Sequence, residues 1–196
     1  MKHILCFIIA IVMTTAANAA ENLTVAGNNL RGPVKTYSVY MAGLAAGTCE
    51  FDRQGRLIKE TDSEKIATYT WHDNNTFDVV VTDLAGNKTG AGTYAWKEEG
   101  NMFIIAMGDN GVAHYLDENG RQLMKLVMVG DRKVNYYYHY DADGNVVGST
   151  IKCDGQPDVE AKIINENIDS YGNARKQTVV MNGQEYPALC KYTYYE

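Results

Sequence analysis

Apolar and polar residues alternate one by one along much of the chain, which is the period of a β-strand with one buried face and not that of a helix. Every second residue of the stretch 77–81 is Phe or Val, and the segments 34–40 and 191–194 carry the β-branched and aromatic residues typical of strands. Helical periodicity is weak, and residues 62–69 are the one segment compatible with a short helix. Strand-like segments recur at short intervals, which predicts about 12 to 14 short strands.

Two of these segments, 102–107 and 123–129, are apolar at nearly every position. Strands of that kind are expected to be covered on both faces. A flat single sheet would leave one face in water, so the pattern favours a chain that folds back over itself. We therefore predict an all-β fold, an antiparallel meander of repeated hairpins curled into a sandwich or an incomplete barrel.

A five-residue motif, Asp-x-x-Gly followed by Asn or Arg, occurs five times and supports the hairpin interpretation. Its Asp and Gly positions are Asp52 and Gly55, Asp83 and Gly86, Asp117 and Gly120, Asp141 and Gly144, and Asp169 and Gly172. The copies are 31, 34, 24 and 28 residues apart, which indicates an irregular repeat of one supersecondary unit. In a type I turn Asp is favoured at the first position, and a left-handed Gly at the fourth closes a hairpin through a bulge. The motif thus predicts five structural turns.

The repeat also carries a family resemblance. Residues 138–146, YHYDADGNV, resemble the Tyr-Asp (YD) repeat unit of bacterial RHS proteins, and residues 169–175, DSYGNAR, are similar to the last unit of small secreted RHS-like proteins of Bacteroidetes-type bacteria. The resemblance covers most of the span 51–175 and implies β-hairpin architecture. It does not imply a toxin shell, since the repeat lengths vary and the chain is short. Only Asp52 and Asp141 directly follow an aromatic residue.

The first nineteen residues have the three-part pattern of a secretory signal peptide: a basic start, an apolar run at 4–12 and Ala17-Asn18-Ala19 before the expected cleavage site. The apolar run is shorter than the roughly 20 residues that a membrane-spanning helix needs. We expect a single all-β repeat domain over residues 20–196, exported to the periplasm or the extracellular space.

Composition narrows the partners of that domain. The chain has 18 basic and 24 acidic residues, and removing Lys2 with the leader changes the net charge from −6 to −7. Without a basic stripe, a nucleic-acid partner is not expected. Three cysteines remain after cleavage, Cys49, Cys153 and Cys190. An oxidising compartment allows any one of three pairings or three free thiols.

Metal and catalytic chemistry have little support. Asp141, Asp143 and Asn145 space oxygen atoms as a calcium loop does, but the EF-hand positions for Gly and Glu hold Val146 and Lys152. The sister motifs also lack a carboxylate at the place of Asp143, so a turn explains all five copies and calcium only one. No cofactor and no metal are expected.

A hydrolase remains an alternative. The histidines that survive export, His72, His114 and His139, lie on separate predicted strands, and no Gly-x-Ser-x-Gly elbow is present. A catalytic site would therefore have to be assembled by the fold from scattered His and carboxylate side chains. We expect no enzyme, and no catalytic residue is assigned.

Fourteen tyrosines and two tryptophans are the remaining functional signal. The candidate binding aromatics are Tyr136, Tyr138, Tyr140, Trp71 and Trp96. The three tyrosines share one strand face, and an exposed face of that kind is suited to stacking against a glycan or a protein. The alternative is that these rings fill the β core. We expect a non-catalytic exported module that binds a protein or a glycan at the cell envelope.

An outer-membrane β-barrel is a further alternative, because export and a length sufficient for eight strands are compatible with it. Membrane strands need about 9–11 residues with an unbroken apolar outer face. The runs between the predicted turns are shorter than that.

Overall fold

Fourteen β-strands make up nearly all of the fold in the computed structural model, which describes residues 24, 28–107, 110–118, 121–129 and 131–196. The expected leader, residues 1–19, and Gly120 lie outside the described residues. The strands are β1 (Val34–Met41), β2 (Leu44–Phe51), β3 (Leu57–Asp62), β4 (Lys65–Trp71), β5 (Thr76–Asp83), β6 (Lys88–Glu99), β7 (Met102–Met107), β8 (Asn110–Leu116), β9 (Gln122–Val129), β10 (Arg132–Tyr140), β11 (Val146–Cys153), β12 (Val159–Ile168), β13 (Ala174–Met181) and β14 (Gln184–Tyr194).

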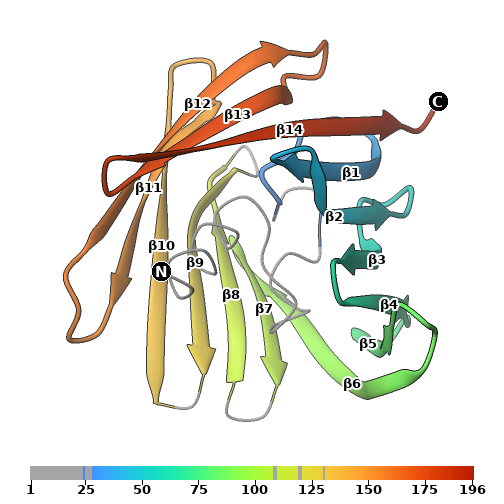
Figure 1. The fold of residues 1–196 in the computed structure, drawn as a ribbon. Helices are drawn as coiled ribbons and strands as arrows, with labels where there is room; N and C mark the ends of the chain where they lie inside the picture. The colour runs from blue at the N-terminus through green and yellow to red at the C-terminus, as the bar shows by residue number, and fades with distance from the viewer. Residues whose placement is uncertain (1–23, 25–27, 108–109, 119–120, 130) are drawn as a thin grey trace.

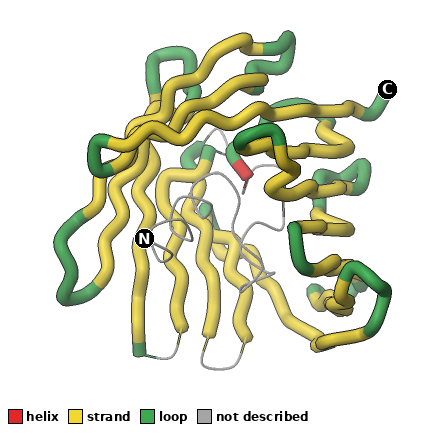
Figure 2. Tube along the Cα trace, in the orientation of Figure 1, coloured by secondary structure: helices red, strands yellow, loops and turns green. Residues whose placement is uncertain are grey.

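Each strand pairs antiparallel with its neighbours in the sequence, and β1 also pairs with β14, so the sheet is a closed barrel. Figure 1 shows β14 running beside β1, and Figure 2 shows how completely strands dominate the trace. The predicted all-β antiparallel meander is confirmed. The predicted sandwich or incomplete barrel is corrected to a closed barrel. Closure depends on pairs such as Tyr37 with Tyr192, whose separation in the sequence leaves no local pattern.

The segment that was compatible with a helix, residues 62–69, is instead the end of β3, a tight turn and most of β4. The Asp62 carboxylate accepts hydrogen bonds from the backbone N–H groups of Glu64 and Lys65 at 2.7 and 2.9 Å. An acidic side chain that satisfies the donors of a turn in this way stabilises the turn against a continuing helix.

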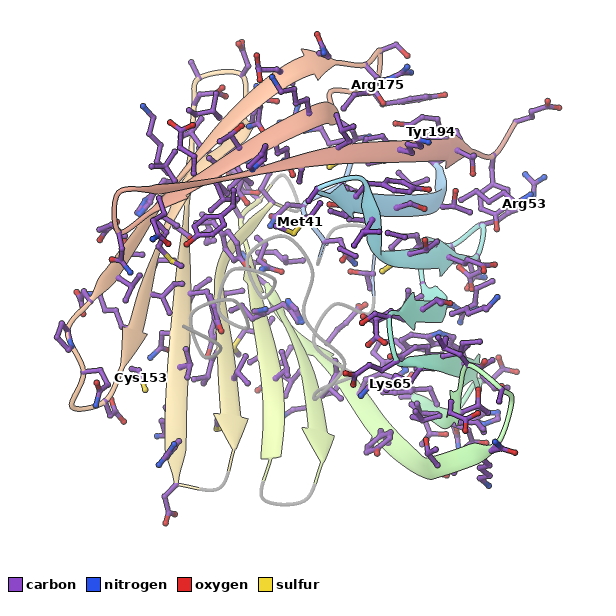
Figure 3. All side chains as sticks on the ribbon, viewed as in Figure 1. Met41, Arg53, Lys65, Cys153, Arg175 and Tyr194 are labelled. Carbon is purple, nitrogen blue, oxygen red and sulfur yellow. The ribbon has the colours of Figure 1, made fainter. Side chains whose placement is uncertain are left out.

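The repeated motif gathers at one end of the barrel. Since consecutive strands run in opposite directions, the turns at 52–56, 117–121, 141–145 and 169–173 all follow strands that run the same way. We call this the repeat end; the fifth copy, at 83–87, lies at the opposite end. Figure 3 labels three residues near the repeat end, Arg53, Arg175 and Tyr194, and three near the opposite end, Met41, Lys65 and Cys153.

The described glycines of the motif adopt the conformation that the turn requires. Gly55, Gly86, Gly144 and Gly172 have φ values of 77°, 88°, 76° and 91°. In each of these turns the glycine N–H donates to the carbonyl oxygen of the motif Asp at 3.0 Å. These four turns are therefore the bulged hairpin turns that the motif predicts.

The barrel interior is mostly apolar, with a few buried polar side chains such as His114 and Lys125, and the outer face is largely polar. Buried side chains such as Val39, Phe51, Phe77 and Ile105 belong to one inner cluster, and a second inner cluster lies around Val127. On the outer face, Lys59 pairs with Glu50 at 3.0 Å and Lys176 with Glu166 at 2.6 Å, and hydroxyl groups pair across strands, as in Thr36 with Thr193 and Ser38 with Thr48. The alternation seen in the sequence is thus the alternation between the inside and the outside of the barrel.

The two continuously apolar runs occupy β7 and β9. Their inward residues Ile105 and Val127 are buried, and outward residues such as Ile104 and Leu126 are only partly covered by neighbouring side chains. We call the outward side chains Met102, Ile104, Tyr115, Met124, Leu126 and Met128 the outer apolar strip; their outward direction follows from the strand register. The expectation that both faces of these strands are covered is met on the inner face alone.

Candidate functional site

The Asn or Arg at the fifth position of the motif has a specific task in the turns. The Asp141 carboxylate accepts one bond from the backbone N–H of Asn145 at 2.7 Å and another from the Asn145 side chain at 3.0 Å. Asp117 accepts the equivalent pair from Arg121, from its backbone N–H at 2.8 Å and from Nε at 2.6 Å. The hydrogen bonds from Asn145 lower the pKa of Asp141. Asn and Arg recur because both carry a side-chain donor that reaches the second carboxylate oxygen.

Residues 28–33, which precede β1, form a segment that we call the strap. The strap is held to the repeat end by the last copy of the motif. The Arg31 backbone N–H donates to Asn173 Oδ1 at 2.9 Å, and Asn173 Nδ2 donates back to the Arg31 carbonyl oxygen at 2.8 Å. Further along, the Tyr140 hydroxyl lies 3.0 Å from Asn29 Oδ1 and 2.6 Å from the Gln122 carbonyl oxygen. The strap therefore connects turns that are distant in the sequence.

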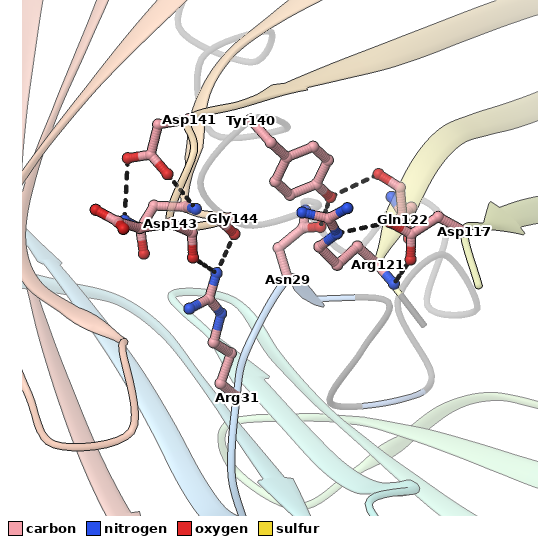
Figure 4. A network of polar contacts seen from close by, with 10 residues as sticks. Asn29, Arg31, Asp117, Arg121, Gln122, Tyr140, Asp141, Asp143 and Gly144 are labelled. Carbon is pink, nitrogen blue, oxygen red and sulfur yellow. Dashed lines mark hydrogen bonds and ion pairs between the residues drawn. The ribbon is translucent and has the colours of Figure 1, made fainter. Parts of the chain in front are cut away.

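A cavity of about 430 Å³ lies between the strap and the inner face of β10 to β14. Its apolar and aromatic walls include Leu30, Tyr37, Tyr138, Tyr140, Ile163, Val179 and Tyr192. Its polar walls include Asn29, Arg31, Arg121, Asp143, Asn165, Asn173 and Gln177. Figure 4 shows the polar side of this region, with Arg31 and Arg121 approaching the 141–145 turn from different directions.

Two guanidinium groups meet beside Gly144. Arg31 Nη2 donates to the carbonyl oxygens of Gly144 and, at 3.2 Å, Asp143. A Cβ atom built on Gly144 would lie 2.9 Å from Arg31 Nη2 and 3.1 Å from Arg121 Nη1. Gly144 therefore serves both a left-handed turn and the close approach of two cations. Any side chain at this position would push the guanidinium groups apart.

The amide side chains deeper in the cavity bond to one another. Gln177 Nε2 donates to Asn165 Oδ1 at 2.9 Å, and Asn165 Nδ2 donates to the Val146 carbonyl oxygen at 2.6 Å. Gln177 Oε1 faces the Cys190 thiol at 3.6 Å. These contacts use both amide oxygens and leave each side chain one amide hydrogen that has no partner among the described residues.

All five candidate aromatics face the barrel interior. Tyr136 is 8% exposed, and Trp71 and Trp96 pack against the buried cluster around Phe77. An exposed stacking platform built from these residues is therefore not what the fold forms. The reason is that the face shared by Tyr136, Tyr138 and Tyr140 is the inner face of β10. Tyr138 and Tyr140 nevertheless line the cavity, and the Arg121 guanidinium lies over the Tyr140 ring, 5.3 Å from its centroid.

Sequence reasoning missed the strap and the cavity. Arg121 was recognised only as the fifth residue of a turn motif, and no local signal marks Arg31, whose partner Asn173 is 142 residues away in the sequence.

The three histidines are not brought together. His72 lies 3.0 Å from Asp78, and His139 Nε2 lies 2.8 Å from the Thr150 hydroxyl, both among exposed side chains. His114 instead is buried, with Nδ1 2.6 Å from Gln122 Oε1. Within the described ranges, no three His, Cys, Asp or Glu side chains are grouped as metal ligands.

The described cysteines, Cys49, Cys153 and Cys190, are free thiols. Cys49 on β2 and Cys190 on β14 flank β1, where they face Tyr37 and Val39 respectively, while Cys153 lies on β11. Burial raises the pKa of the Cys49 and Cys190 thiols. Of the alternatives that the sequence left open, the structure corresponds to three unpaired thiols.

No protein-family model matches the chain, and no curated protein matches it. Two solved structures with a similar outline are both described as porin-like proteins. The one from Bacteroides vulgatus ATCC 8482 has a TM-score of 0.47 and 12% identity and covers 83% of this chain and 98% of that chain. The one from Bacteroides uniformis ATCC 8492 has a TM-score of 0.43 and 12% identity and covers 84% and 99%. A likeness of this degree carries no argument about function. Among the described residues, no helix has the length and apolarity needed to cross a membrane.

Proposed function

We propose that this chain is a non-catalytic exported β-barrel of the cell envelope that binds a small ligand in the cavity beneath the strap. The supporting observation is the cavity itself, whose volume of about 430 Å³ lies within the range of roughly 300–1,000 Å³ typical of small-molecule sites. Its walls combine tyrosine rings and aliphatic side chains with a few oriented amide and guanidinium groups, as ligand sites usually do. A cavity of this size suits a small molecule or one or two sugar units of a glycan better than a folded protein.

The polar outer face supports a barrel that works in water. Besides the ion pairs on β2, β3, β12 and β13, the Thr150 hydroxyl links His139 to Glu160, at 2.8 and 3.0 Å, across three neighbouring strands. Asp78 similarly receives the Thr93 hydroxyl at 2.6 Å. Outward charges near the middle of a bilayer cost about 2–4 kcal/mol each for Lys or Arg. A face with this many charged groups is stabilised by water.

An outer-membrane barrel is the second candidate, and the outer apolar strip is the observation that favours it. The strip covers consecutive outward positions on β7 and β9 and one position on β8 between them, as part of a lipid-facing band would. The two candidates differ in how the exported protein behaves without detergent. A water-borne barrel stays monodisperse at submicellar detergent concentrations, whereas a membrane barrel aggregates and is recovered with the outer-membrane fraction.

The cavity is tested with the neutral fluorophore N-phenylnaphthylamine, whose emission rises in apolar surroundings. Ala174 is buried, faces inward and lines the cavity, so Ala174→Trp fills part of the space. Thr178→Trp places the same side chain on the outer face of the same strand and is the matched control. The proposal predicts saturable binding that Ala174→Trp abolishes and Thr178→Trp preserves. Equal binding by both variants, or none by the wild type, would refute it.

A further inference from the structure

Several hydrogen-bond donors that line the cavity have no acceptor in the part of the chain that the structure describes. The amide oxygens of Asn165 and Gln177 already accept bonds, and each side chain keeps one amide hydrogen without a partner among the described residues. Arg121 Nε donates to the Asp117 carboxylate. Its two terminal nitrogen atoms have no hydrogen-bond partner within the described ranges. Donors without acceptors select a ligand that supplies oxygen acceptors.

The positive charge of Arg31 is not compensated by a salt bridge, whereas that of Arg121 is paired with Asp117 at 2.6 Å. The Arg31 guanidinium is held by two backbone carbonyl oxygens, and within the described residues it forms no ion pair with a carboxylate. A Cβ atom at Gly144 would lie 2.9 Å from Arg31 Nη2 and 3.1 Å from Arg121 Nη1, so these two nitrogen atoms are at most about 6 Å apart. An oxyanion bonded to both would span that separation, because charge-assisted N–H···O⁻ bonds are about 2.7–2.9 Å long.

The nearby carboxylates are mostly engaged by their own turns. Asp117 accepts from Arg121, Asp141 from Asn145, and Asp169 from the backbone N–H of Asn173 at 3.0 Å and from the Tyr194 hydroxyl. Asp143 is the exception, since its carboxylate forms no hydrogen bond within the described residues, although the residue lines the cavity. The Asp143 carboxylate therefore repels an anion in the cavity and limits the affinity with which the anion binds.

We infer that the ligand is an amphipathic anion whose oxyanion head is held by Arg31 and Arg121, while its body packs on the tyrosine and aliphatic side chains of the cavity. The inference rests on the proposed function, because it names the ligand of the same cavity. Tyr138, Ile163 and Val179 line the same cavity and supply aromatic and aliphatic surface. The shared chemistry is thus a carboxylate, phosphate or sulfate on an apolar or ring-shaped body. A lipid and an acidic sugar are its two sources.

The test compares ligands that differ only in the head group. Dodecanoate and dodecanol, and galacturonate and galactose, are titrated against bound N-phenylnaphthylamine in the exported full chain. One acid is expected to displace the probe at a concentration at least about tenfold lower than its neutral partner, a difference of about 1.4 kcal/mol that a charge-assisted hydrogen bond can supply. The acid that does so identifies the source. The advantage should shrink as salt is raised.

Variants distinguish binding at the two arginines from a general effect of the charge of the protein. Arg31→Gln should remove the preference for the acid, Arg31→Lys should retain part of it, and Arg132→Gln, which removes an exposed charge at the opposite end, should leave it unchanged. Asp143→Asn should strengthen binding of the acid without changing that of the alcohol. If the probe binds but acids and neutral partners compete equally in all variants, the inference is wrong and the proposed function stands. If the probe does not bind, the proposed function itself fails.

Discussion

Asn173 and Arg31 bond to each other twice, once through each backbone polar group of Arg31. In other copies of the motif the fifth-position side chain donates to its own Asp, as Asn145 does to Asp141. Asn173 gives this contact up, and the Tyr194 hydroxyl takes its place on Asp169. One copy of a turn motif has thus been diverted to hold the strap over the cavity.

Because Asn173 bonds to the strap and Asn145 does not, the same Asn→Ala substitution should lower the free energy of unfolding by different amounts at the two positions. Asn173 is 4% exposed, and Asn173→Ala removes two strap bonds and leaves the half-buried N–H and carbonyl groups of Arg31 unpaired. We expect a loss of about 2–4 kcal/mol in the free energy of unfolding. Asn145→Ala, in an exposed turn, should cost less than about 1 kcal/mol. Urea unfolding of the two variants checks this; equal costs would show that the strap is not fastened by Asn173.

The glycines of the motif provide a second comparison. Gly86 and Gly172 have φ values of +88° and +91°, but only at Gly172 would a Cβ meet another side chain, with Arg31 Nη1 at 2.9 Å. Both Gly→Ala changes should cost about 1–2 kcal/mol for the left-handed backbone. Gly172→Ala should cost about 1 kcal/mol more, because Arg31 must leave its carbonyl partners. In an Arg31→Ala background that extra cost should disappear, and its persistence would point to another cause.

Acid should destabilise the turns in a predictable direction. The pKa of Asp141 is lowered by the hydrogen bonds from Asn145, so its carboxylate stabilises the fold above the ordinary value of 3.8. That contribution is lost as the pH falls toward the lowered folded-state value. Melting temperatures measured between neutral pH and strong acid should therefore drop less steeply for Asp141→Asn than for the wild type. Asp143→Asn is the control within the same turn, and the account fails here if both variants flatten the profile equally.

Thiol reactivity tests the interior. Cys49 and Cys190 are 5% and 4% exposed, and burial raises the pKa of both thiols, whereas Cys153 is half-buried. After export, a charged thiol reagent should modify Cys153 in the native protein and all three cysteines after unfolding. Cys153→Ser should abolish the native reaction. If two of the cysteines react with the reagent only after reduction, they form a disulfide, and this result would contradict the barrel register.

The turns were predictable from the sequence and the closure of the barrel was not, for a physical reason. An Asp-x-x-Gly turn is fixed by bonds within five residues, so its chemistry is visible in the motif. Closure depends on the pairing of β1 with β14, and the strap depends on Asn173, both across most of the chain. The alternating pattern also gives the two faces of a strand without saying which is inside. Tyr138 and Tyr140 could therefore be selected as candidate binding residues, but the sequence left open whether their shared face is exposed or fills the core.

Methyl NMR can locate a ligand bound between the strap and the inner face of β10 to β14. On titration with dodecanoate, methyl signals of Leu30, Ile163 and Val179, which line the cavity, should shift in a saturable way. The outward methyl groups of Val80 and Leu189, 39% and 53% exposed, should not move. Shifts confined to the outer apolar strip, for example at Ile104 and Leu126, would contradict the account and place the ligand on the outside of the barrel.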